Sequence, residues 1–334
     1  MAKKYFLGVE STAHTFGIGI AKKGNVLSNV KSAYTTEKGG IIPVDAARHH
    51  RENREKIYVQ ALENAKIKED EIKAIAFSQG PGLSPCLIEG MKFAKSLAEN
   101  LNLPLIPVNH CVAHLEIGGS IKPSSPKNPV MLYASGANTQ VISYEAGKYR
   151  VFGETLDTGV GNFLDNFARH LGLGFPGGPK IEVLAKKGKE YIELPYRVKG
   201  MDVALSGILT NLKQKIESGK FKKEDLAYST QETVFAMLVE VSERALAHLG
   251  KKELLLGGGV GCNSRLQEMC GKMCEERGAR FYVPPRDLLV DNGAMIAFLG
   301  EIMFKNGINF LGKKAMELDI KPRQRTDDIE VKWK

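Results

Sequence analysis

One order of predicted elements occurs twice along the chain, and this repeat limits the possible folds more than any other feature of the sequence. In each half, two short apolar segments that we predict to be strands are joined by a loop of small, hydroxyl-rich residues, Glu10–Thr15 and Ser135–Thr139. Further along each half, an apolar strand leads into a glycine loop and then a helix, at 75–82 and 255–261. The repeat predicts two similar α/β units in place of one continuous sheet.

A β-hairpin followed by strand, glycine loop and helix, present twice, is typical of the actin-like or sugar-kinase-like (ASKHA) fold, whose two lobes bind a nucleotide. We therefore predict an α/β protein with an N-terminal lobe at 1–129 and a C-terminal lobe at 130–334, the C-terminal helix being free to pack back on the first lobe. The segment 165–229 has no counterpart in the first half, so we expect a helical insertion there in the second lobe.

The composition predicts a two-domain protein of the cytoplasm. The chain has 334 residues, of which 43% are hydrophobic, enough for two ordinary cores. It has neither a basic-then-apolar start nor an uninterrupted apolar stretch of about 18 residues, so we predict neither secretion nor membrane insertion. Its five cysteines are an odd number and form no CxxC pair, which argues against a disulfide framework.

The chain carries a net charge of +9, which attracts polyanions, and nucleic acid is the obvious candidate. The alternative is a lysine-rich, merely solvated surface, which is common in heat-stable proteins. No zinc-finger, helix-turn-helix or RNA-recognition signature is present to decide between the two. The basic residues are clustered as Lys186, Lys187 and Lys189; Lys213 and Lys215; Lys220, Lys222 and Lys223; Lys313 and Lys314; and Lys321, Arg323 and Arg325.

Two histidines, His110 and His114, lie four residues apart in a run that we predict to turn helical after Val108. In a helix this spacing puts both imidazoles on one face, about one turn apart, where they can bind one metal ion. The alternative is a pair of structural histidines. The spacing also occurs in H-E-x-x-H zinc peptidases, but Cys111 occupies the place of their general-base glutamate, which argues against a peptidase.

A further metal ligand is expected at Asp291, which opens an apolar helix. An aspartate in that place is usually a helix N-cap, but two histidines need a carboxylate to complete a site for a hard or borderline metal. Tyr133, at the entry to the second loop, could add a phenolate. No residue is marked as a general base; Glu10 and His14 are candidates by location alone, and Glu10 is equally consistent with a structural hairpin residue.

Several segments rich in glycine or small residues are candidates for a nucleotide site. Backbone N–H groups of the two hairpin loops, Glu10–Thr15 and Ser135–Thr139, can surround a phosphate, and side chains of the second loop add donors. One such loop alone would be an ordinary tight hairpin, but two at matching positions favour phosphate binding. The glycines of 257–263 would let a flat ring approach the backbone, and this run lacks the lysine of a P-loop. The Gly/Pro run 172–182 ends at Glu182, which with Asp165 could accept hydrogen bonds from ribose hydroxyls.

Seven short motifs are distinctive: Glu10–Thr15, Thr36–Gly40, Phe77–Gly82, Asn109–Glu116, Asp157–Asn162, Gly174–Pro179 and Asp291–Met295. Together they resemble the universal tRNA threonylcarbamoyladenosine transferase family, formerly described as O-sialoglycoprotein endopeptidases. The resemblance extends from about residue 5 to residue 331. The first motif and the run at 174–180 are similar to the archaeal and eukaryotic branch, the catalytic subunit of the KEOPS complex, and no kinase segment follows the matched region.

The resemblance implies an acyltransferase that moves the L-threonylcarbamoyl group from threonylcarbamoyl-AMP to N6 of adenosine 37 in tRNAs that read ANN codons. It implies one divalent metal ion, iron or zinc with Fe(II) favoured, held by residues that match His110, His114, Tyr133 and Asp291. ATP, ADP or AMP analogues could occupy the nucleotide site. The expected partners are tRNA and the other KEOPS subunits: a small kinase/ATPase, a dimerising subunit and a tRNA-binding subunit. The expected nucleotide-binding residues are Tyr133, Ala134, Ser135, Gly136, Ala137, Asp165, Gly178, Glu182 and Asn263.

Two positions depart from the family pattern. Ala137 replaces the second glycine of the family's Ser-Gly-Gly-Asn-Thr loop, so we predict a negative φ at Ala137. Leu205 replaces the phenylalanine of a Phe-Ser-Gly motif, while Ser206 is retained.

Two other functions remain open. An actin-fold phosphotransferase of a small metabolite would need a catalytic aspartate in the first lobe and ATP turnover without tRNA. Glu10 occupies the position where such folds often carry that aspartate, which argues against this alternative. A non-catalytic, nucleotide-bound scaffold would present tRNA to partner subunits, and modification would survive the loss of Asp291.

Overall fold

The computed structural model describes residues 3–37 and 40–334, so residues 38 and 39 of the Thr36–Gly40 motif lie outside the described part. The chain divides into two compact units. Unit 1 contains Met1–Tyr34, Ile41–Ser125 and Asp291–Lys334, and unit 2 contains Thr35–Gly40 and Pro126–Val290. These units differ from the expected lobes, 1–129 and 130–334, mainly because the segment from Asp291 onward belongs to unit 1.

Unit 1 is built on a five-stranded sheet with the strand order β3-β2-β1-β4-β5. β2 is antiparallel to both of its neighbours, β1 and β3, whereas β4 is parallel to its neighbours β1 and β5. The strands are β1 (Tyr5–Glu10), β2 (Thr15–Lys22), β3 (Asn25–Ala33), β4 (Ile72–Gly80) and β5 (Leu105–Asn109).

Unit 2 repeats this design in a sheet with the order β12-β11-β6-β7-β8. Its first three strands form an antiparallel meander and the last two add in parallel, as in unit 1. The two sheets confirm the repeat predicted from the sequence, although β12 has only three residues and gives too short a pattern to be predicted. The strands are β6 (Val130–Ala134), β7 (Thr139–Glu145), β8 (Lys148–Glu154), β11 (Glu253–Gly257) and β12 (Arg280–Tyr282).

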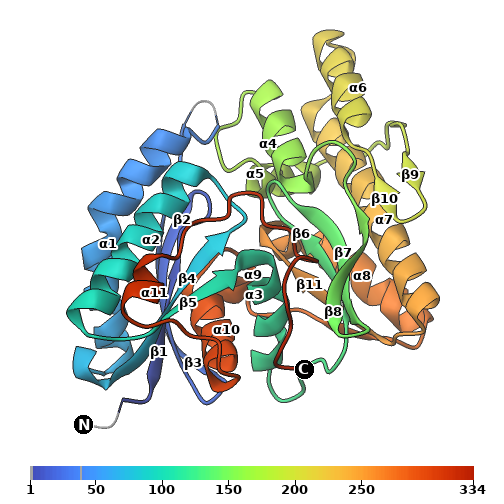
Figure 1. Ribbon diagram of the computed structural model, residues 1–334. Helices are drawn as coiled ribbons and strands as arrows, with labels where there is room; N and C mark the ends of the chain where they lie inside the picture. Colours follow the sequence, from blue (N-terminus) through green and yellow to red (C-terminus); the bar gives the residue numbers. More distant parts are fainter. Residues whose placement is uncertain (1–2, 38–39) are drawn as a thin grey trace. The chain divides into compact units, whose positions relative to one another are not determined.

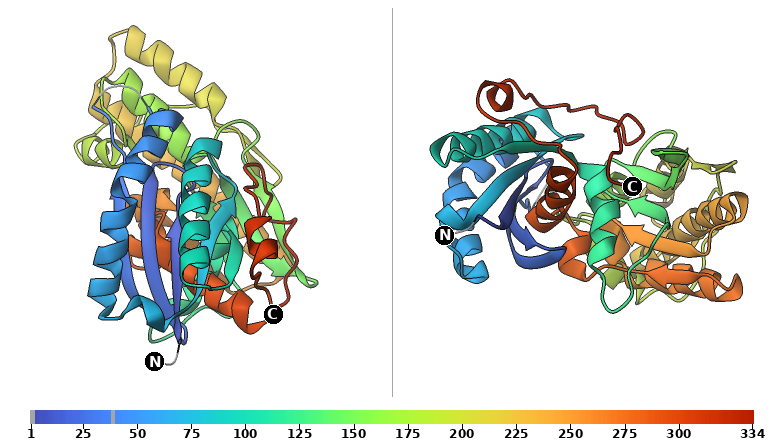
Figure 2. Two further views of the ribbon diagram at one scale, coloured as in Figure 1. Left: turned by 60° about the vertical axis from the view of Figure 1, so that its left-hand side comes forward. Right: turned by 60° about the horizontal axis from the view of Figure 1, so that its bottom comes forward.

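Helices cover both faces of the unit 1 sheet (Figures 1 and 2). Side chains alternate along β1, so Leu7 and Val9 point into a hydrophobic core with residues of α1 and α2, while Gly8 lies against α10. The helices of this unit are α1 (Pro43–Ala65), α2 (Ser84–Asn100), α3 (His110–Glu116), α10 (Gly293–Lys305) and α11 (Lys313–Met316).

Helix α10 lies directly on the backbone of β1 and β2. A Cβ on Gly8 would lie 2.2 Å from the backbone nitrogen of Ala297, and a Cβ on Gly19 would lie 2.1 Å from that of Ala294. On the helix side, a Cβ on Gly293 would lie 2.3 Å from the Gly19 nitrogen. Only glycine fits at these three positions, so the start of α10 is held in one place on the sheet.

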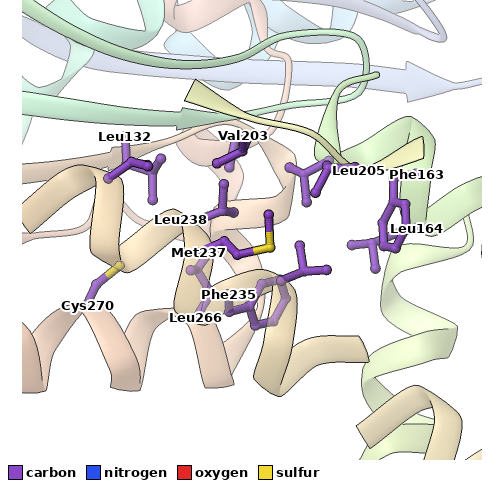
Figure 3. Packing of buried hydrophobic residues seen from close by; sticks show 14 of the residues in the cluster. Leu132, Phe163, Leu164, Val203, Leu205, Phe235, Met237, Leu238, Leu266 and Cys270 are labelled. Carbon is purple, nitrogen blue, oxygen red and sulfur yellow. The ribbon is translucent and has the colours of Figure 1, made fainter. Parts of the chain in front are cut away.

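The unit 2 core is formed by residues of its sheet, such as Leu132, and of the helices after β8, such as Phe163 and Phe235 (Figure 3). Leu205, which replaces the family's phenylalanine, is fully buried in this core together with Phe163 and Val203. Between β8 and β11 the chain forms four helices and the short hairpin β9–β10, whereas the described residues between β3 and β4 form a single α-helix, α1. These elements are α4 (Val160–His170), α5 (Gly178–Ala185), β9 (Val198–Lys199), β10 (Asp202–Val203), α6 (Ser206–Glu217) and α7 (Lys223–Leu249). Two more helices of unit 2, α8 (Ser264–Glu276) and α9 (Arg286–Leu289), follow β11.

Among the described residues, no helix is both long enough and apolar enough to cross a membrane.

The close approach of α10 to the sheet predicts the effect of one added methyl group. Gly19→Ala forces the helix away from β2, so we expect the free energy of unfolding to fall by about 1–3 kcal/mol, measured by thermal and urea unfolding. Gly207→Ala in α6 is the control, because a Cβ at Gly207 meets no atom within 4 Å. That variant should be neutral or more stable, since alanine favours a helix. Equal effects of the two substitutions would contradict the packing argument.

Candidate metal centre and nucleotide site

Helix α3 presents His110 and His114 on one face, as their spacing predicts. The helix begins after Asn109, whose side-chain oxygen accepts a hydrogen bond from the Val112 backbone N–H at 3.0 Å and so caps the first turn. Both imidazoles are buried, with 4% and 1% of their residue surfaces exposed, and the ring centres are 4.8 Å apart. The parallel strand β5 delivers this helix to the end of the unit 1 sheet.

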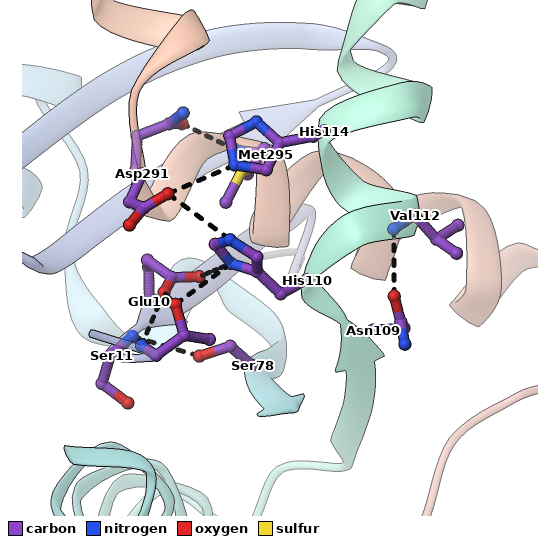
Figure 4. Close-up of polar contacts among 11 residues, drawn as sticks. Glu10, Ser11, Ser78, Asn109, His110, Val112, His114, Asp291 and Met295 are labelled. Carbon is purple, nitrogen blue, oxygen red and sulfur yellow. Dashed lines mark hydrogen bonds and ion pairs between the residues drawn. The ribbon is translucent and has the colours of Figure 1, made fainter. Parts of the chain in front are cut away.

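Asp291 faces both imidazoles from the start of α10 (Figure 4). The N-cap of α10 is Asn292, whose side chain accepts from the Met295 N–H at 2.9 Å, so the Asp291 carboxylate is not used as the cap. Its Oδ1 lies 3.4 Å from Nε2 of His110 and 3.3 Å from Nε2 of His114.

Glu10 lies on the other side of His110. Its Oε2 is 2.9 Å from Nδ1 of His110, and its Oε1 accepts from the backbone N–H and the hydroxyl of Thr12 at 2.7 and 2.6 Å. The Glu10 side chain is fully buried, so these contacts fix its carboxylate. A carboxylate on the far nitrogen of an imidazole orients the ring and leaves the near nitrogen for a metal ion.

Each charge in this group affects the protonation of the others. Burial alone would lower the pKa of His110, but the Glu10 and Asp291 carboxylates outweigh it and raise that pKa well above its usual range. For His114 burial prevails and lowers the pKa. Burial would raise the pKa of Asp291, but the charge and hydrogen bond of His110 hold that pKa well below its usual range. Asp291 is therefore ionised at neutral pH, in the form that binds a cation.

The donor set fits a divalent transition metal. His110, His114 and Asp291 offer two imidazole nitrogens and one carboxylate oxygen that all lie within 4.8 Å of one another. Such a mixture of nitrogen and oxygen donors suits iron or zinc. Tyr133, the fourth ligand implied by the resemblance, is fully buried on β6 and belongs to unit 2, so its role as a ligand stays a prediction.

The first hairpin loop differs from the predicted phosphate-binding loop. The Ser11 N–H donates to Oγ of Ser78 at 3.1 Å, and the Thr12 N–H donates to Glu10. The Thr12 carbonyl accepts from the N–H of Leu83 at 2.8 Å. These N–H groups are thus used inside the protein, and the loop holds Glu10 against His110 instead of presenting donors to a phosphate.

His14, the other candidate base, lies just before β2, and its carbonyl accepts from the Tyr34 N–H at 2.8 Å. The side chain that supports this loop is His50 of α1. His50 is fully buried against Phe16, and its Nε2 lies 3.0 Å from the carbonyl oxygen of Ala13. His50 therefore holds the first loop in place through the Ala13 carbonyl, a role that the sequence pattern does not reveal.

In unit 2 the second hairpin loop is fastened to the start of α4. The Ser135 N–H donates to the Asn138 carbonyl at 2.9 Å and closes the loop. The N–H groups of Gly161 and Asn162 donate to the carbonyls of Ser135 and Gly136 at 3.0 and 2.9 Å. The loop carbonyls therefore point at α4.

Ala137 has the negative φ that its side chain requires. Among the described residues, the non-glycine residues with positive φ are Lys23, Lys66, Asn102 and Ala146, and Ala137 is not one of them. A Cβ on Gly159 would lie 2.5 Å from the Ala137 carbonyl oxygen, so the glycine there lets the loop and α4 meet. The prediction for Ala137 is confirmed.

The glycine loop after β11 joins the same part of unit 2. Gly258 has a φ of +87°, and a Cβ there would lie 2.4 Å from the Ala134 carbonyl oxygen. Asp165 on α4 accepts from the Gly177 N–H at 2.7 Å and holds the Gly/Pro run at the start of α5. A Cβ on Gly178 meets no atom within 4 Å, so there is open space beside this residue.

Glu182 and Asn263 meet at the start of α8. Oε1 of Glu182 accepts from the backbone N–H and the hydroxyl of Ser264 at 3.1 and 2.6 Å. Burial alone would raise the pKa of Glu182, but these hydrogen bonds lower that pKa and keep the carboxylate ionised. The Asn263 side chain caps α8 through the Arg265 N–H and donates to Gln231 at 2.6 Å. Sequence reasoning missed Ser264 and Gln231, although Ser264 directly follows a predicted site residue.

Solved structures to which the chain is similar define its class. They include HypF of Thermococcus kodakarensis, with a TM-score of 0.62 and 18% identity over 92% of this chain and 49% of that chain. They also include component A of the Acidaminococcus fermentans (R)-2-hydroxyglutaryl-CoA dehydratase, with a TM-score of 0.54 and 16% identity over 90% and 98%. At these identities the likeness concerns the fold alone, and it confirms the actin-like, sugar-kinase-like α/β class expected from the repeat.

The sequence identifies the family within that class. Residues 25–298 match the TsaD family, tRNA N6-adenosine threonylcarbamoyltransferase. The chain is 55% identical to the protein of that name from Thermococcus sibiricus, over 98% of this chain and 99% of the relative. It is 51% identical to the "probable bifunctional tRNA threonylcarbamoyladenosine biosynthesis protein" of Methanosarcina mazei, over 100% of this chain and 60% of the relative. The chain therefore belongs to the tRNA N6-adenosine threonylcarbamoyltransferase family, in its archaeal and eukaryotic branch, and is an acyltransferase.

His50 should make the stability of the protein depend on pH. Burial lowers its pKa from 6.5 to about 4, so between these values the unfolded chain binds a proton that the folded chain does not. Stability is then complete above pH 6.5 and falls as the pH decreases toward 4. Between pH 8 and pH 5, we expect the unfolding free energy of the wild type to fall by about 2 kcal/mol more than that of His50→Gln. The glutamine retains a donor for the Ala13 carbonyl, and urea unfolding at both pH values measures the difference. Identical pH dependence of both proteins would contradict this assignment.

Proposed function

We propose that this chain transfers the L-threonylcarbamoyl group from threonylcarbamoyl-AMP to N6 of adenosine 37 in tRNAs that read ANN codons. The observation that carries the proposal is the buried group of His110, His114 and Asp291, with Glu10 behind His110, in a chain of this family. Relatives at 49–55% identity are named for this transfer, which supports the same substrates here.

The reaction needs few groups from the protein. The N6 amine attacks the carbamoyl carbonyl carbon, the bond from that carbon to the phosphate oxygen breaks, AMP leaves with the electron pair, and N6 loses a proton. An aromatic amine is a poor nucleophile, so alignment of the two substrates contributes more than the strength of any base. The fixed loops of unit 2 suit that task.

We propose that His110, His114, Asp291 and Tyr133 hold one divalent metal ion, Fe(II) or zinc. When bound, a divalent cation would polarise the carbonyl of the mixed anhydride. Glu10 is then a positioning residue, because it bonds Nδ1 of His110 and keeps Nε2 directed at Asp291. The contacts of Glu10 argue against its predicted role as a general base, since its carboxylate is buried and already accepts from Thr12.

We propose that the nucleotide part of the substrate binds in unit 2. In support, the loop after β6, the start of α4 and the glycine loop after β11 are in direct contact. The open space beside Gly178 and the ionised carboxylate of Glu182 lie on the adjoining α5. The proposed binding residues are those implied by the resemblance: Tyr133, Ala134, Ser135, Gly136, Ala137, Asp165, Gly178, Glu182 and Asn263.

We also propose that the chain acts in the cytoplasm as the catalytic subunit of a KEOPS complex, with a small kinase/ATPase, a dimerising subunit and a tRNA-binding subunit. The Methanosarcina mazei relative is named bifunctional and extends beyond the matched region, which supports a second protein working with this one.

Loss of a metal-binding side chain should abolish transfer. We expect His110→Ala and Asp291→Asn to lower the rate of labelled threonylcarbamoyl transfer to tRNA at least about a hundredfold. The reason is that a metal ion that polarises the carbonyl stabilises the transition state by several kcal/mol. His248→Ala, at an exposed histidine of α7, is the matched control and should retain full activity. Full activity of His110→Ala would refute the metal assignment. Full activity of Asp291→Asn would favour the non-catalytic scaffold. Rapid ATP turnover without tRNA would favour the phosphotransferase.

Glu10→Gln should weaken metal binding without unfolding the protein. An amide can still meet His110, but it carries no charge to orient the ring, and we expect the metal affinity to fall about 10–100-fold. Competition with a chelator, followed by metal analysis, measures this affinity directly. Glu52→Gln, at an exposed glutamate of α1, serves as the control. Unchanged metal affinity in Glu10→Gln would show that Glu10 has only a structural role.

A further inference from the structure

Three basic side chains from separate parts of unit 2 meet at the C-terminal end of α4. Lys223, the first residue of α7, donates from Nζ to the Leu171 carbonyl at 3.3 Å. Burial lowers the pKa of His170, and the charges of Lys213 on α6 and of Arg169 on its own helix lower that pKa further, against the opposite effect of Glu217. We call Arg169, Lys213 and Lys223 the α4-end cluster; α4 and α6 pack side by side there (Figures 1 and 2).

Among the described residues, no carboxylate forms an ion pair with the α4-end cluster, although the charge of Glu217 acts on the adjoining His170. In the part of the chain that the structure describes, Lys213 and Lys223 form no ion pair, and Arg169 bonds only the side-chain amide of Asn166. Elsewhere basic side chains are closely paired, as in Arg265–Glu232 at 2.7 Å, Arg280–Glu253 at 2.6 Å and Lys305–Glu301 at 2.7 Å. The cluster is thus a place where positive charge remains available to a partner.

The sequence around the cluster increases its positive charge. Residues 213–223 contain five lysines and one glutamate, Glu217. Phe221, in the loop between α6 and α7, is 37% exposed, and Nζ of Lys215 lies 4.8 Å from the centre of its ring. Exposed aromatic rings among unpaired lysines are typical of surfaces that bind single-stranded or looped RNA, because bases stack on the rings while phosphates meet the cations.

The cluster lies on the same helix as the proposed nucleotide site. The start of α4 bonds the 135–138 loop through Gly161, and Arg169 lies eight residues further along, about 12 Å away. This is a fraction of one duplex turn of about 34 Å. A nucleic acid with one base at the loop therefore carries phosphates within reach of the cluster.

We propose that the α4-end cluster binds the phosphate backbone of the tRNA whose adenosine is modified, and so fixes the RNA relative to the nucleotide site of unit 2. The proposal rests on the proposed function for the identity of the RNA. The positive charge provides the attraction, and α4 connects the cluster rigidly to the loop that would hold the donor nucleotide.

The test is a charge-removal variant of the full chain, Arg169→Gln/Lys213→Gln/Lys223→Gln. We expect its dissociation constant for an unmodified tRNA transcript to rise at least about tenfold, and the slope of log K against log salt to decrease by about two to three, one phosphate contact for each lost cation. Transfer at saturating tRNA should keep its rate, with the loss confined to KM.

The matched control is Lys148→Gln/Arg150→Gln/Lys272→Gln, which removes the same charge from exposed positions elsewhere in unit 2. It should bind tRNA as the wild type does. The charge-preserving variant Arg169→Lys/Lys213→Arg/Lys223→Arg should restore both affinity and salt slope, which a merely structural role of these residues would not predict.

Equal tRNA affinity of the charge-removal variant and the control variant overturns the proposal, as does failure of the charge-preserving variant to restore binding. Either result leaves the proposed function intact if transfer still requires His110. Conversely, an active His110→Ala protein would refute the proposed metal chemistry while the binding comparison stands by itself.

Discussion

The backbone contact between α10 and the strands β1 and β2 is the constraint on which the candidate metal centre depends. Glycines on both sides, Gly8 and Gly19 on the strands and Gly293 on the helix, let the two backbones approach without intervening side chains. The first turn of the helix is therefore fixed on the sheet, with Asn292 capping it and Asp291 just before it. The carboxylate meets imidazoles that arrive from the neighbouring end of the same sheet on α3. A single methyl group at this contact would separate groups that are distant in sequence.

Electrostatics explains why four ionisable side chains can be buried together. An isolated charge in such a place would be costly, because its hydration is lost. His110 lies between two carboxylates, and each of them has a second set of donors or partners: Thr12 for Glu10 and His114 for Asp291. The imidazole nitrogens of His110 and His114 and a carboxylate oxygen of Asp291 therefore lie within 4.8 Å of one another. The same arrangement that offsets the cost of burial also forms the donor set for a cation.

The sequence predicts the strands of the repeat and the histidine pair well, because both are periodic and local. Asp291 could be proposed only from the chemistry of the missing ligand, since its neighbour Asn292 serves as the cap that such a position usually demands. The first and second loops look alike in sequence, yet the first turns its N–H groups inward to Ser78 and Glu10. Those partners are decided by long-range packing, which no local pattern contains. The same holds for Gln231 beside Asn263. The sequence allows the C-terminal helix to pack back on unit 1, but it does not mark Asp291 as the start of the returning segment.

That return has a consequence for how the protein is made. On the ribosome the chain emerges from its N-terminus, and unit 2, at 126–290, is contiguous apart from one short segment, so it can fold as soon as it has emerged. Unit 1 is different, because its sheet waits for α10 until unit 2 has been translated. Until then the glycine faces of β1 and β2 are uncovered, and His110 and His114 lack the Asp291 carboxylate. The three side chains of the candidate metal centre can therefore come together only after unit 2 has been synthesised.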